Sequence, residues 1–327
     1  MGMKNMIGSV DSRREGSKLS IVGAGAVGSS LAYAAMIEGV ARHIVLEDIN
    51  GPKVRAEALD LIHGGQFVPE ALIEGSDDVD STADSDVVVI TAGAKQQPGQ
   101  SRLDLAGSTV KLMQNILPPL VERSPDAIFL MVTNPVDVTT QAALKISGLP
   151  PSRLFGSGTV LDSSRLRQLI AETCAVATGN VHAYMCGEHG DSETPMWSTA
   201  SIGGVPILDW KFGNGKCFTE EKLDEISQRV VNAAYEVIEG KGATNFAIGV
   251  SACRIIKAIL RDERAVLPVS RMLTNWHGIG DVCMSVPTIV GARGAVRQLE
   301  LEVSESELSQ LRASADQIRE TATSLGY

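Results

Sequence analysis

The sequence predicts an α/β fold in which a doubly wound parallel sheet is followed by a mixed α+β domain. Short, continuously apolar segments alternate with helical segments through the first half, as in parallel sheets that are covered on both faces. A glycine-rich turn joins the first apolar segment to the first helical one, which is typical of sheets that bind nucleotides. After Pro150 and Pro151 the pattern changes to long helices and paired apolar segments.

In the first half, strands are predicted at 19–22, 43–46, 87–90 and 128–132, each mostly apolar. A helix is predicted at 29–39, where the chain is rich in alanine and stops at a glycine, and a second at 53–63. Right-handed connections between successive parallel strands then place helices on both faces of the sheet.

In the second half, helices are predicted at 219–240 and 244–260, and strands with turns at 265–273 and 281–291. A charged amphipathic helix is predicted at 304–325. It begins with Ser304 and Glu307, the spacing of a capping box.

The length of 327 residues suggests about two domains. We expect a flexible N-terminal tail at 1–17, because this segment is rich in glycine, serine and charge. A nucleotide-binding domain is expected at 18–158, with a substrate lid at about 92–106, and a catalytic domain at 159–327.

The formal net charge of −10 argues against a nucleic-acid partner, because nucleic acids are bound mainly by basic surfaces. The five cysteines are odd in number and show no CxxC spacing, which favours reduced thiols in a cytoplasmic protein and no metal. No apolar run approaches the ~20 residues of a membrane span, and the N-terminus lacks the apolar run of a signal peptide.

A GxGxxG motif is formed by Gly23, Gly25 and Gly28. It follows a predicted strand and opens a helix, the context in which glycines let a pyrophosphate approach the backbone and rest on the helix N-terminus. Asp48 lies 20 residues beyond Gly28, where an acid bonds the ribose of NAD and repels the extra phosphate of NADP. Glu47 is adjacent, but alternation along a strand lets only one of the two face the cofactor. The motif therefore predicts a Rossmann domain that binds NAD.

Three further segments carry unusual sets of residues. The loop at 92–102 is rich in glycine, proline and polar residues, which suits either a lid that excludes water or an ordinary surface loop. Asp162 and Arg165 share one helix face, as catalytic partners or as a salt bridge at the helix start. His189 stands between glycines in a polar turn, an unusual place for a structural histidine.

With these segments in order, the sequence resembles the lactate/malate dehydrogenase family, and within it the bacterial L-lactate dehydrogenases. The resemblance runs from about residue 18 to 325. It is carried by the glycine motif and by the sequences VTNPV at 132–136, LDSSR at 161–165 and GEHGD at 187–191.

The resemblance implies a role for each matching residue. His189 resembles the proton donor and acceptor, with an ordinary pKa near ~6.5 suited to neutral pH, and Asp162 its orienting partner. Arg165 resembles the residue that grips the substrate carboxylate, and Arg102 the one that polarises the ketone. The remaining implied contacts are Asn134 and Thr244 with substrate, and Val27, Asn134, Ser157 and Ile248 with NAD.

The resemblance also bears on the substrate. Gln96 matches the lid position at which malate dehydrogenases carry arginine, so a neutral side chain there favours pyruvate and L-lactate over oxaloacetate and malate. Lys95 could supply a cation if the lid shifted register, so malate or a larger 2-hydroxy acid stays an alternative. A second alternative is an NAD-binding structural protein without catalysis. The presence of His189, Asp162, Arg165 and Arg102 argues against it.

Bacterial relatives are often activated by fructose 1,6-bisphosphate at a subunit interface. Arg167 and His182 match that allosteric site, although both could simply line an interface. The family is usually a homotetramer, and we expect the same assembly here.

Overall fold

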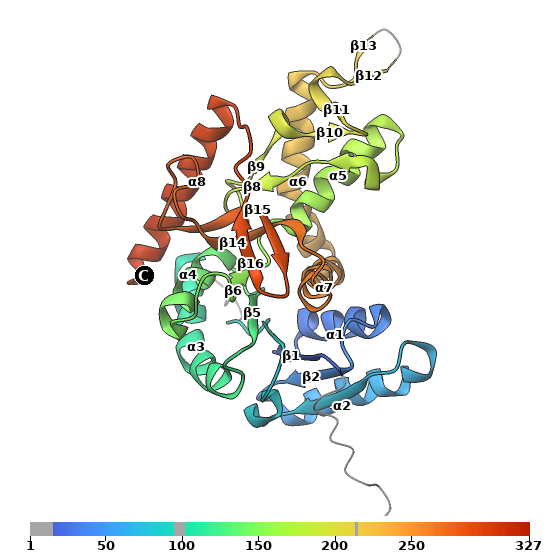
Figure 1. The fold of residues 1–327 in the computed structure, drawn as a ribbon, viewed down its shortest axis with the longest axis vertical. Coiled ribbons are helices and arrows are strands. Elements are labelled where there is room, and N and C mark those ends of the chain that lie inside the picture. The colour runs from blue at the N-terminus through green and yellow to red at the C-terminus, as the bar shows by residue number, and fades with distance from the viewer. Residues whose placement is uncertain (1–15, 95–101, 213–214) are drawn as a thin grey trace, which may run out of the picture.

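The computed structural model describes residues 16–94, 102–212 and 215–327. Within these ranges, one nine-stranded sheet runs through the molecule in the order β16-β15-β14-β6-β5-β4-β1-β2-β3 (Figure 1). The expected tail lies almost wholly outside the described residues, and so does most of the expected lid. Residues 102–106 of the expected lid form the start of a helix.

Six strands of the sheet are parallel, in the order β3-β2-β1-β4-β5-β6. This is a doubly wound sheet whose order reverses between β1 and β4, the place where such sheets bind ligands. The six strands are β1 (Lys18–Val22), β2 (His43–Glu47), β3 (Leu72–Ser76), β4 (Val87–Ile90), β5 (Ile128–Met131) and β6 (Leu154–Gly156).

The continuous apolar strands are buried on both faces, as predicted. In β4, Val87 and Val89 pack into one core with α1 and α7, whereas Val88 and Ile90 pack into a second core with α3. The period of two along a strand produces this division. The helices of the first half are α1 (Ala26–Glu38), α2 (Gly51–His63), α3 (Arg102–Arg123) and α4 (Val136–Ser147).

The sheet continues into the second half of the chain through antiparallel strands. Ser270 of β14 (Ala265–Met272) pairs with Gly156 of β6, and β15 (Cys283–Gly291) and β16 (Gly294–Gln298) follow. The helices here are α5 (Val160–Cys174), α6 (Glu220–Lys241), α7 (Phe246–Leu260) and α8 (Glu305–Ser324). The predicted capping box of α8, between Ser304 and Glu307, is present.

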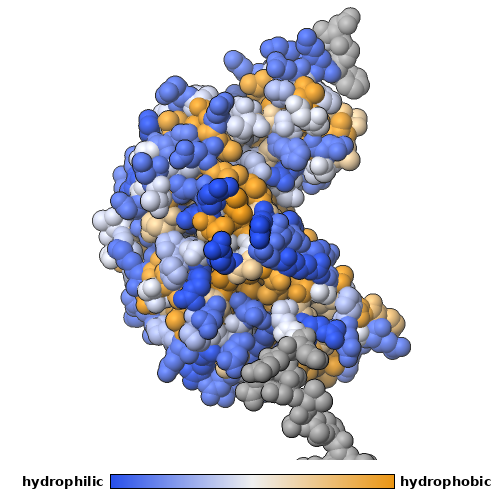
Figure 2. Space-filling view, in the orientation of Figure 1, coloured by the Kyte–Doolittle hydropathy of each residue, from blue (hydrophilic) through white to orange (hydrophobic). Residues whose placement is uncertain are grey.

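Among the described residues, short strands build three small sheets in the second half of the chain. Their bounds are β7 (Val181–His182), β8 (Met185–Cys186), β9 (Thr194–Pro195), β10 (Ser201–Ile202), β11 (Val205–Pro206), β12 (Lys211–Phe212) and β13 (Gly215–Lys216). The space-filling view is hollowed between the upper part of the molecule, with α5 and α6, and the lower part, with α1 and α2 (Figure 2).

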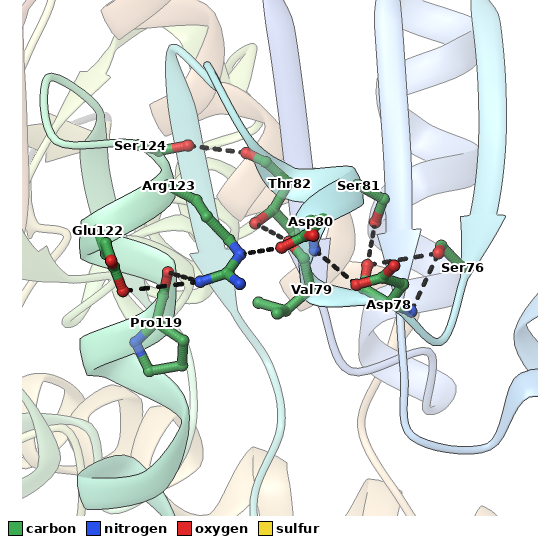
Figure 3. Close-up of polar contacts among 10 residues, drawn as sticks. All are labelled: Ser76, Asp78, Val79, Asp80, Ser81, Thr82, Pro119, Glu122, Arg123 and Ser124. Carbon is green, nitrogen blue, oxygen red and sulfur yellow. Dashed lines mark hydrogen bonds and ion pairs between the residues drawn. The ribbon is translucent and has the colours of Figure 1, made fainter.

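A polar network fastens the C-terminal end of α3 to the turn that leads into β4 (Figure 3). The Arg123 side chain donates to Asp80 and to the carbonyl of Pro119, and the Ser124 hydroxyl donates to the carbonyl of Thr82 at 2.7 Å. These contacts fix α3, whose first residue is Arg102, against the parallel sheet. Among the described residues, no helix is long and apolar enough to cross a membrane.

Candidate active site

The glycine loop connects β1 to α1 beside the end of β4. Gly23 has a φ of 101°, a left-handed conformation that favours glycine, and its carbonyl accepts a hydrogen bond from the Thr91 hydroxyl at 2.7 Å. A Cβ on Gly28 would lie 1.9 Å from the Gly23 carbonyl oxygen, so this close turn requires glycine.

Gly25, by contrast, faces open space. It is the N-cap of α1, no side chain caps the helix there, and a Cβ at this position would have no heavy atom within 4 Å. The free N–H groups and positive end of the helix dipole therefore meet a cradle into which a phosphate group fits. The glycine loop and the N-terminus of α1 therefore fit the pyrophosphate of a dinucleotide.

Asp48 follows β2 and turns toward the glycine loop. Its carboxylate accepts hydrogen bonds from the Ala24 backbone N–H at 2.8 Å and from that of Asn50 at 2.9 Å. Glu47 is partly buried, and burial together with the neighbouring Asp48 and Asp78 raises its pKa to about 7. Glu47 contacts the loop only through its backbone carbonyl, whereas Asp48 contacts it through its carboxylate, which supports the predicted role of Asp48 beside the ribose.

The remaining predicted cofactor contacts lie along the same edge of the sheet. Val27 of α1 and Ile248 of α7 pack against one core, and Figure 1 shows the two helices side by side. Asn134 follows the carboxyl end of β5 and is exposed, whereas Ser157 follows β6 and is buried.

His189 lies in the loop after β8 and pairs with Asp162 in the first turn of α5. The His189 Nδ1 and an Asp162 carboxylate oxygen are 2.6 Å apart, and Asp162 is only 2% exposed. The backbone N–H of His189 donates to Asp137 at 2.7 Å, and the Ser270 hydroxyl donates to the other oxygen of Asp137 at 2.5 Å. Because Asp137 lies in the first turn of α4, shortly after β5, these bonds hold His189 near the carboxyl edge of the sheet.

Arg165 contacts the same carboxylate from one helical turn further along α5. Its guanidinium Nη1 donates to the second oxygen of Asp162 at 2.6 Å. Asp162 and Arg165 therefore form a salt bridge at the start of a helix. The same salt bridge also belongs to the cluster around His189, so the two alternatives raised by the sequence do not exclude each other. The planar guanidinium carries further N–H donors that can bind a substrate carboxylate.

The charges around His189 favour its protonated form. Burial alone lowers the pKa of the imidazole, but Asp162, Glu193 and Asp137 outweigh burial and raise it to about 9. Burial likewise raises the pKa of Asp162, but His189 and Arg165 outweigh it and hold that pKa below its usual value. The ordinary histidine pKa expected from the sequence is therefore not what this environment supports.

Glu193 is a member of this cluster that the sequence analysis missed. Its carboxyl lies within 4.8 Å of Asp162 and His189, and the residue is 8% exposed. Burial first, and then the negative charge of Asp162, raise the pKa of Glu193 to about 9. The three side chains are close enough to contact one cation, but His189 Nδ1 and Asp162 already satisfy each other by a hydrogen bond. Glu193 stands four residues after His189 in a polar turn, and nothing in that pattern indicates burial.

The structure says less about three other residues that were predicted to bind substrate. Gln96 lies outside the described residues, and Arg102 is placed only as the first residue of α3. Thr244 is half-buried just before α7, which begins at Phe246 rather than at Thr244 as predicted.

The two residues predicted to bind an effector lie close together. The Arg167 Nε donates to the carbonyl of Ala183 at 2.9 Å, and its guanidinium lies 5.0 Å from the ring centre of Tyr184. His182, adjacent to Ala183, is exposed on β7. The pair therefore occupies one patch of the second half of the chain.

Two family models cover most of the chain. The lactate/malate dehydrogenase NAD-binding domain matches residues 17–156, and the α/β C-terminal domain of the same proteins matches residues 159–325. The chain belongs to the lactate/malate dehydrogenase family. Its cofactor is NAD, as the glycine motif predicted, and the resemblance and fold class expected from the sequence are confirmed.

Two curated relatives and one solved structure that resemble this chain are named L-lactate dehydrogenase. A protein of Bifidobacterium animalis subsp. lactis named L-lactate dehydrogenase is 54% identical over 97% of this chain and 100% of its own length. One of Kosmotoga olearia with the same name is 47% identical over 94% of this chain and 96% of its own. The crystal structure of the minor L-lactate dehydrogenase from Enterococcus mundtii, in a ligand-bound form, superposes with a TM-score of 0.91 at 39% identity. It covers 94% of this chain and 98% of its own.

Proposed function

We propose that this chain is an L-lactate dehydrogenase that interconverts pyruvate and L-lactate, with NAD as cofactor and His189 and Asp162 as its proton relay. The observation that carries the proposal is the 2.6 Å contact between His189 and Asp162, with Arg165 on the same carboxylate and the NAD-binding loop in the same chain. When bound, the nicotinamide supplies or accepts a hydride at the substrate C2.

His189 handles the proton. The contact of its Nδ1 with Asp162 assigns the Nδ1 proton to that bond and leaves Nε2 to exchange a proton with the substrate oxygen. Asp162 keeps the imidazole in one tautomer and stabilises the cation, as the acid does in other His-Asp pairs. The pKa of about 9 keeps the imidazole charged at neutral pH, the form that donates a proton to pyruvate.

The other site residues bind the substrate or NAD. Arg165 grips the substrate carboxylate through the donors that Asp162 leaves free, Arg102 polarises the ketone, and Asn134 bonds the substrate oxygen. Thr244 borders the substrate pocket. Val27, Ser157 and Ile248 contact NAD together with Gly23, Gly25, Gly28 and Asp48. Residues 18–158 and 159–327 then act as NAD-binding and catalytic domains, with a lid at about 92–106.

Pyruvate is preferred over oxaloacetate because Gln96 is neutral. A second carboxylate buried without a cation costs about 3–5 kcal/mol. The five cysteines of the chain are free thiols, which supports a cytoplasmic location.

Steady-state oxidation of NADH with pyruvate and with oxaloacetate tests this proposal. The chain should turn over pyruvate with the higher kcat/KM, and Gln96→Arg should shift the preference toward oxaloacetate. Gln168→Arg, which places the same charge at an exposed site on α5, should leave the preference unchanged. A higher kcat/KM for oxaloacetate in the wild type would indicate a malate dehydrogenase, and no turnover of either would indicate a protein without this catalysis.

The assembly is a homotetramer regulated by fructose 1,6-bisphosphate at Arg167 and His182. A groove of about 430 Å³ between α1 and α7, lined in part by Tyr33, Ile37, Phe246 and Val250, supports burial against another subunit. Sedimentation and pyruvate turnover, each with and without the sugar bisphosphate, test both points. A monomer, or activity that does not respond, would contradict the corresponding point.

A further inference from the structure

We propose that Glu193 works as a neutral carboxylic acid that donates its own proton to Asp162 and thereby positions that carboxylate for His189. The inference deepens the proposed function and rests on it. Glu193 is a positioning residue, because it acts on the substrate only through Asp162 and His189.

The first support is the way the two acids are buried together. Glu193 and Asp162 are 8% and 2% exposed, and their carboxyl oxygens lie within 4.8 Å of each other. Two ionised carboxylates at that separation in a buried site repel strongly, so one of them retains a proton. Asp162 is the one that is ionised, because it accepts from Arg165 and pairs with His189, each at 2.6 Å.

The second support is an oxygen of Glu193 that has no donor. The Glu193 Oε2 is buried, and no hydrogen-bond donor among the described residues faces it. An ionised carboxylate needs donors on both oxygens when water is excluded, whereas a neutral carboxyl brings its own proton. That proton has an acceptor within reach in Asp162, and a hydrogen bond between the two carboxyls fits their positions.

The third support is the charge of the whole cluster. Asp162 and Arg165 face Glu193 from α5, His189 and Glu188 come from the loop after β8, and Asp137 comes from α4. When the substrate carboxylate joins, the two positive charges of Arg165 and a protonated His189 already face three acids, namely that carboxylate, Asp162 and Asp137. An ionised Glu193 would add a buried negative charge without a partner.

A neutral Glu193 also sets the proton affinity of His189. A negative charge on Glu193 would contribute to the raised pKa of the imidazole. Without that charge the pKa of the imidazole is lower, so His189 releases its proton to pyruvate more readily while Asp162 still favours uptake of a proton from lactate. The proton on Glu193 thus keeps the relay reversible.

The pH dependence of kcat/KM for pyruvate in Glu193→Gln and Glu193→Ala tests the inference. Glutamine is neutral and can still donate to Asp162. It should therefore recover most of the activity that alanine loses, and the pH at which activity falls should stay within about 0.3 of the wild type. If Glu193 were ionised, Glu193→Gln would remove a charge and lower that pH by about 1 or more. Such a fall, or a Glu193→Ala enzyme that matches the wild type, would overturn the proposal.

A second measurement does not depend on turnover. In infrared difference spectra of the NADH complex at neutral pH, wild type minus Glu193→Gln should show the carbonyl band of a protonated carboxyl. A difference confined to carboxylate bands would contradict the proposal even if the activity assay failed. Glu172→Gln is the control, because it removes an exposed carboxylate from the same helix that carries Asp162. A chain that shows the carbonyl band but does not reduce pyruvate would contradict the proposed function alone.

Discussion

At the scale of single residues, Asp162 connects the parts of the site. One oxygen of its carboxylate contacts His189 and the other contacts Arg165, so a buried acid receives two cationic partners. Removing one partner from a buried ionic cluster is far more costly than removing an exposed charge, because the remaining groups stay desolvated. The same carboxylate sets both the tautomer of the imidazole and the position of the guanidinium.

Asp162→Asn should therefore damage catalysis more than folding. The amide holds its position but can donate to Nδ1 and favour the wrong tautomer, so kcat should fall by roughly 10²- to 10⁴-fold. Loss of the negative charge also lowers the pKa of His189. The protonated imidazole is lost as pH rises through that pKa, so the fall in pyruvate reduction should move to lower pH.

Rate against pH for Asp162→Asn, beside the exposed control Asp60→Asn, measures both effects. A variant with the wild-type rate and an unmoved profile would show that Asp162 is not the partner of the catalytic histidine.

At the scale of elements, two glycines at the start of α1 are present for different reasons. Gly28 is required by the fold, since a Cβ there would lie 1.9 Å from the carbonyl oxygen of Gly23. Gly25 has room for a side chain and an ordinary φ of −75°, so the fold does not require glycine there. The space beside Gly25 is what a pyrophosphate would occupy.

Alanine at each position should distinguish these uses. Gly28→Ala should lower the melting temperature and weaken NADH binding together. Gly25→Ala should keep the wild-type melting temperature yet bind NADH at least ~10-fold more weakly, about 1.4 kcal/mol. Thermal unfolding and fluorescence titration with NADH measure these effects, with Gly65→Ala as a control in equally open space. Wild-type affinity in Gly25→Ala would mean that the pyrophosphate lies elsewhere.

At the scale of the whole molecule, the sequence predicts the apolar strands well because burial on both faces leaves a strong signal. The strands at 43–46 and 87–90 and the helix ending at His63 lie where they were expected. β3 was not predicted, because Leu72–Ser76 contains Glu74 and Gly75 and lies at the edge of the sheet, where Leu72 is exposed. Helix starts were misplaced by a few residues, since α1 begins at Ala26 inside the glycine motif rather than at Ser29.

Long-range contacts escaped the sequence for a different reason. Local patterns could not show that β14 joins β6, because one residue pair, Ser270 and Gly156, makes that junction. The burial of Glu193 against Asp162 likewise depends on how α5 packs on the loop after β8. The order of the motifs could identify His189, Asp162 and Arg165. The position of Glu193 beside them depends on tertiary packing, which the motifs do not show.

A crystal structure of the complex with NADH and oxamate, an unreactive analogue of pyruvate, tests the central claim most directly. The carboxylate of oxamate should lie on Arg165, its carbonyl oxygen should face Nε2 of His189, and the pyrophosphate should lie against Gly25. Oxamate bound away from Arg165 and His189, with both side chains unchanged, would contradict the account.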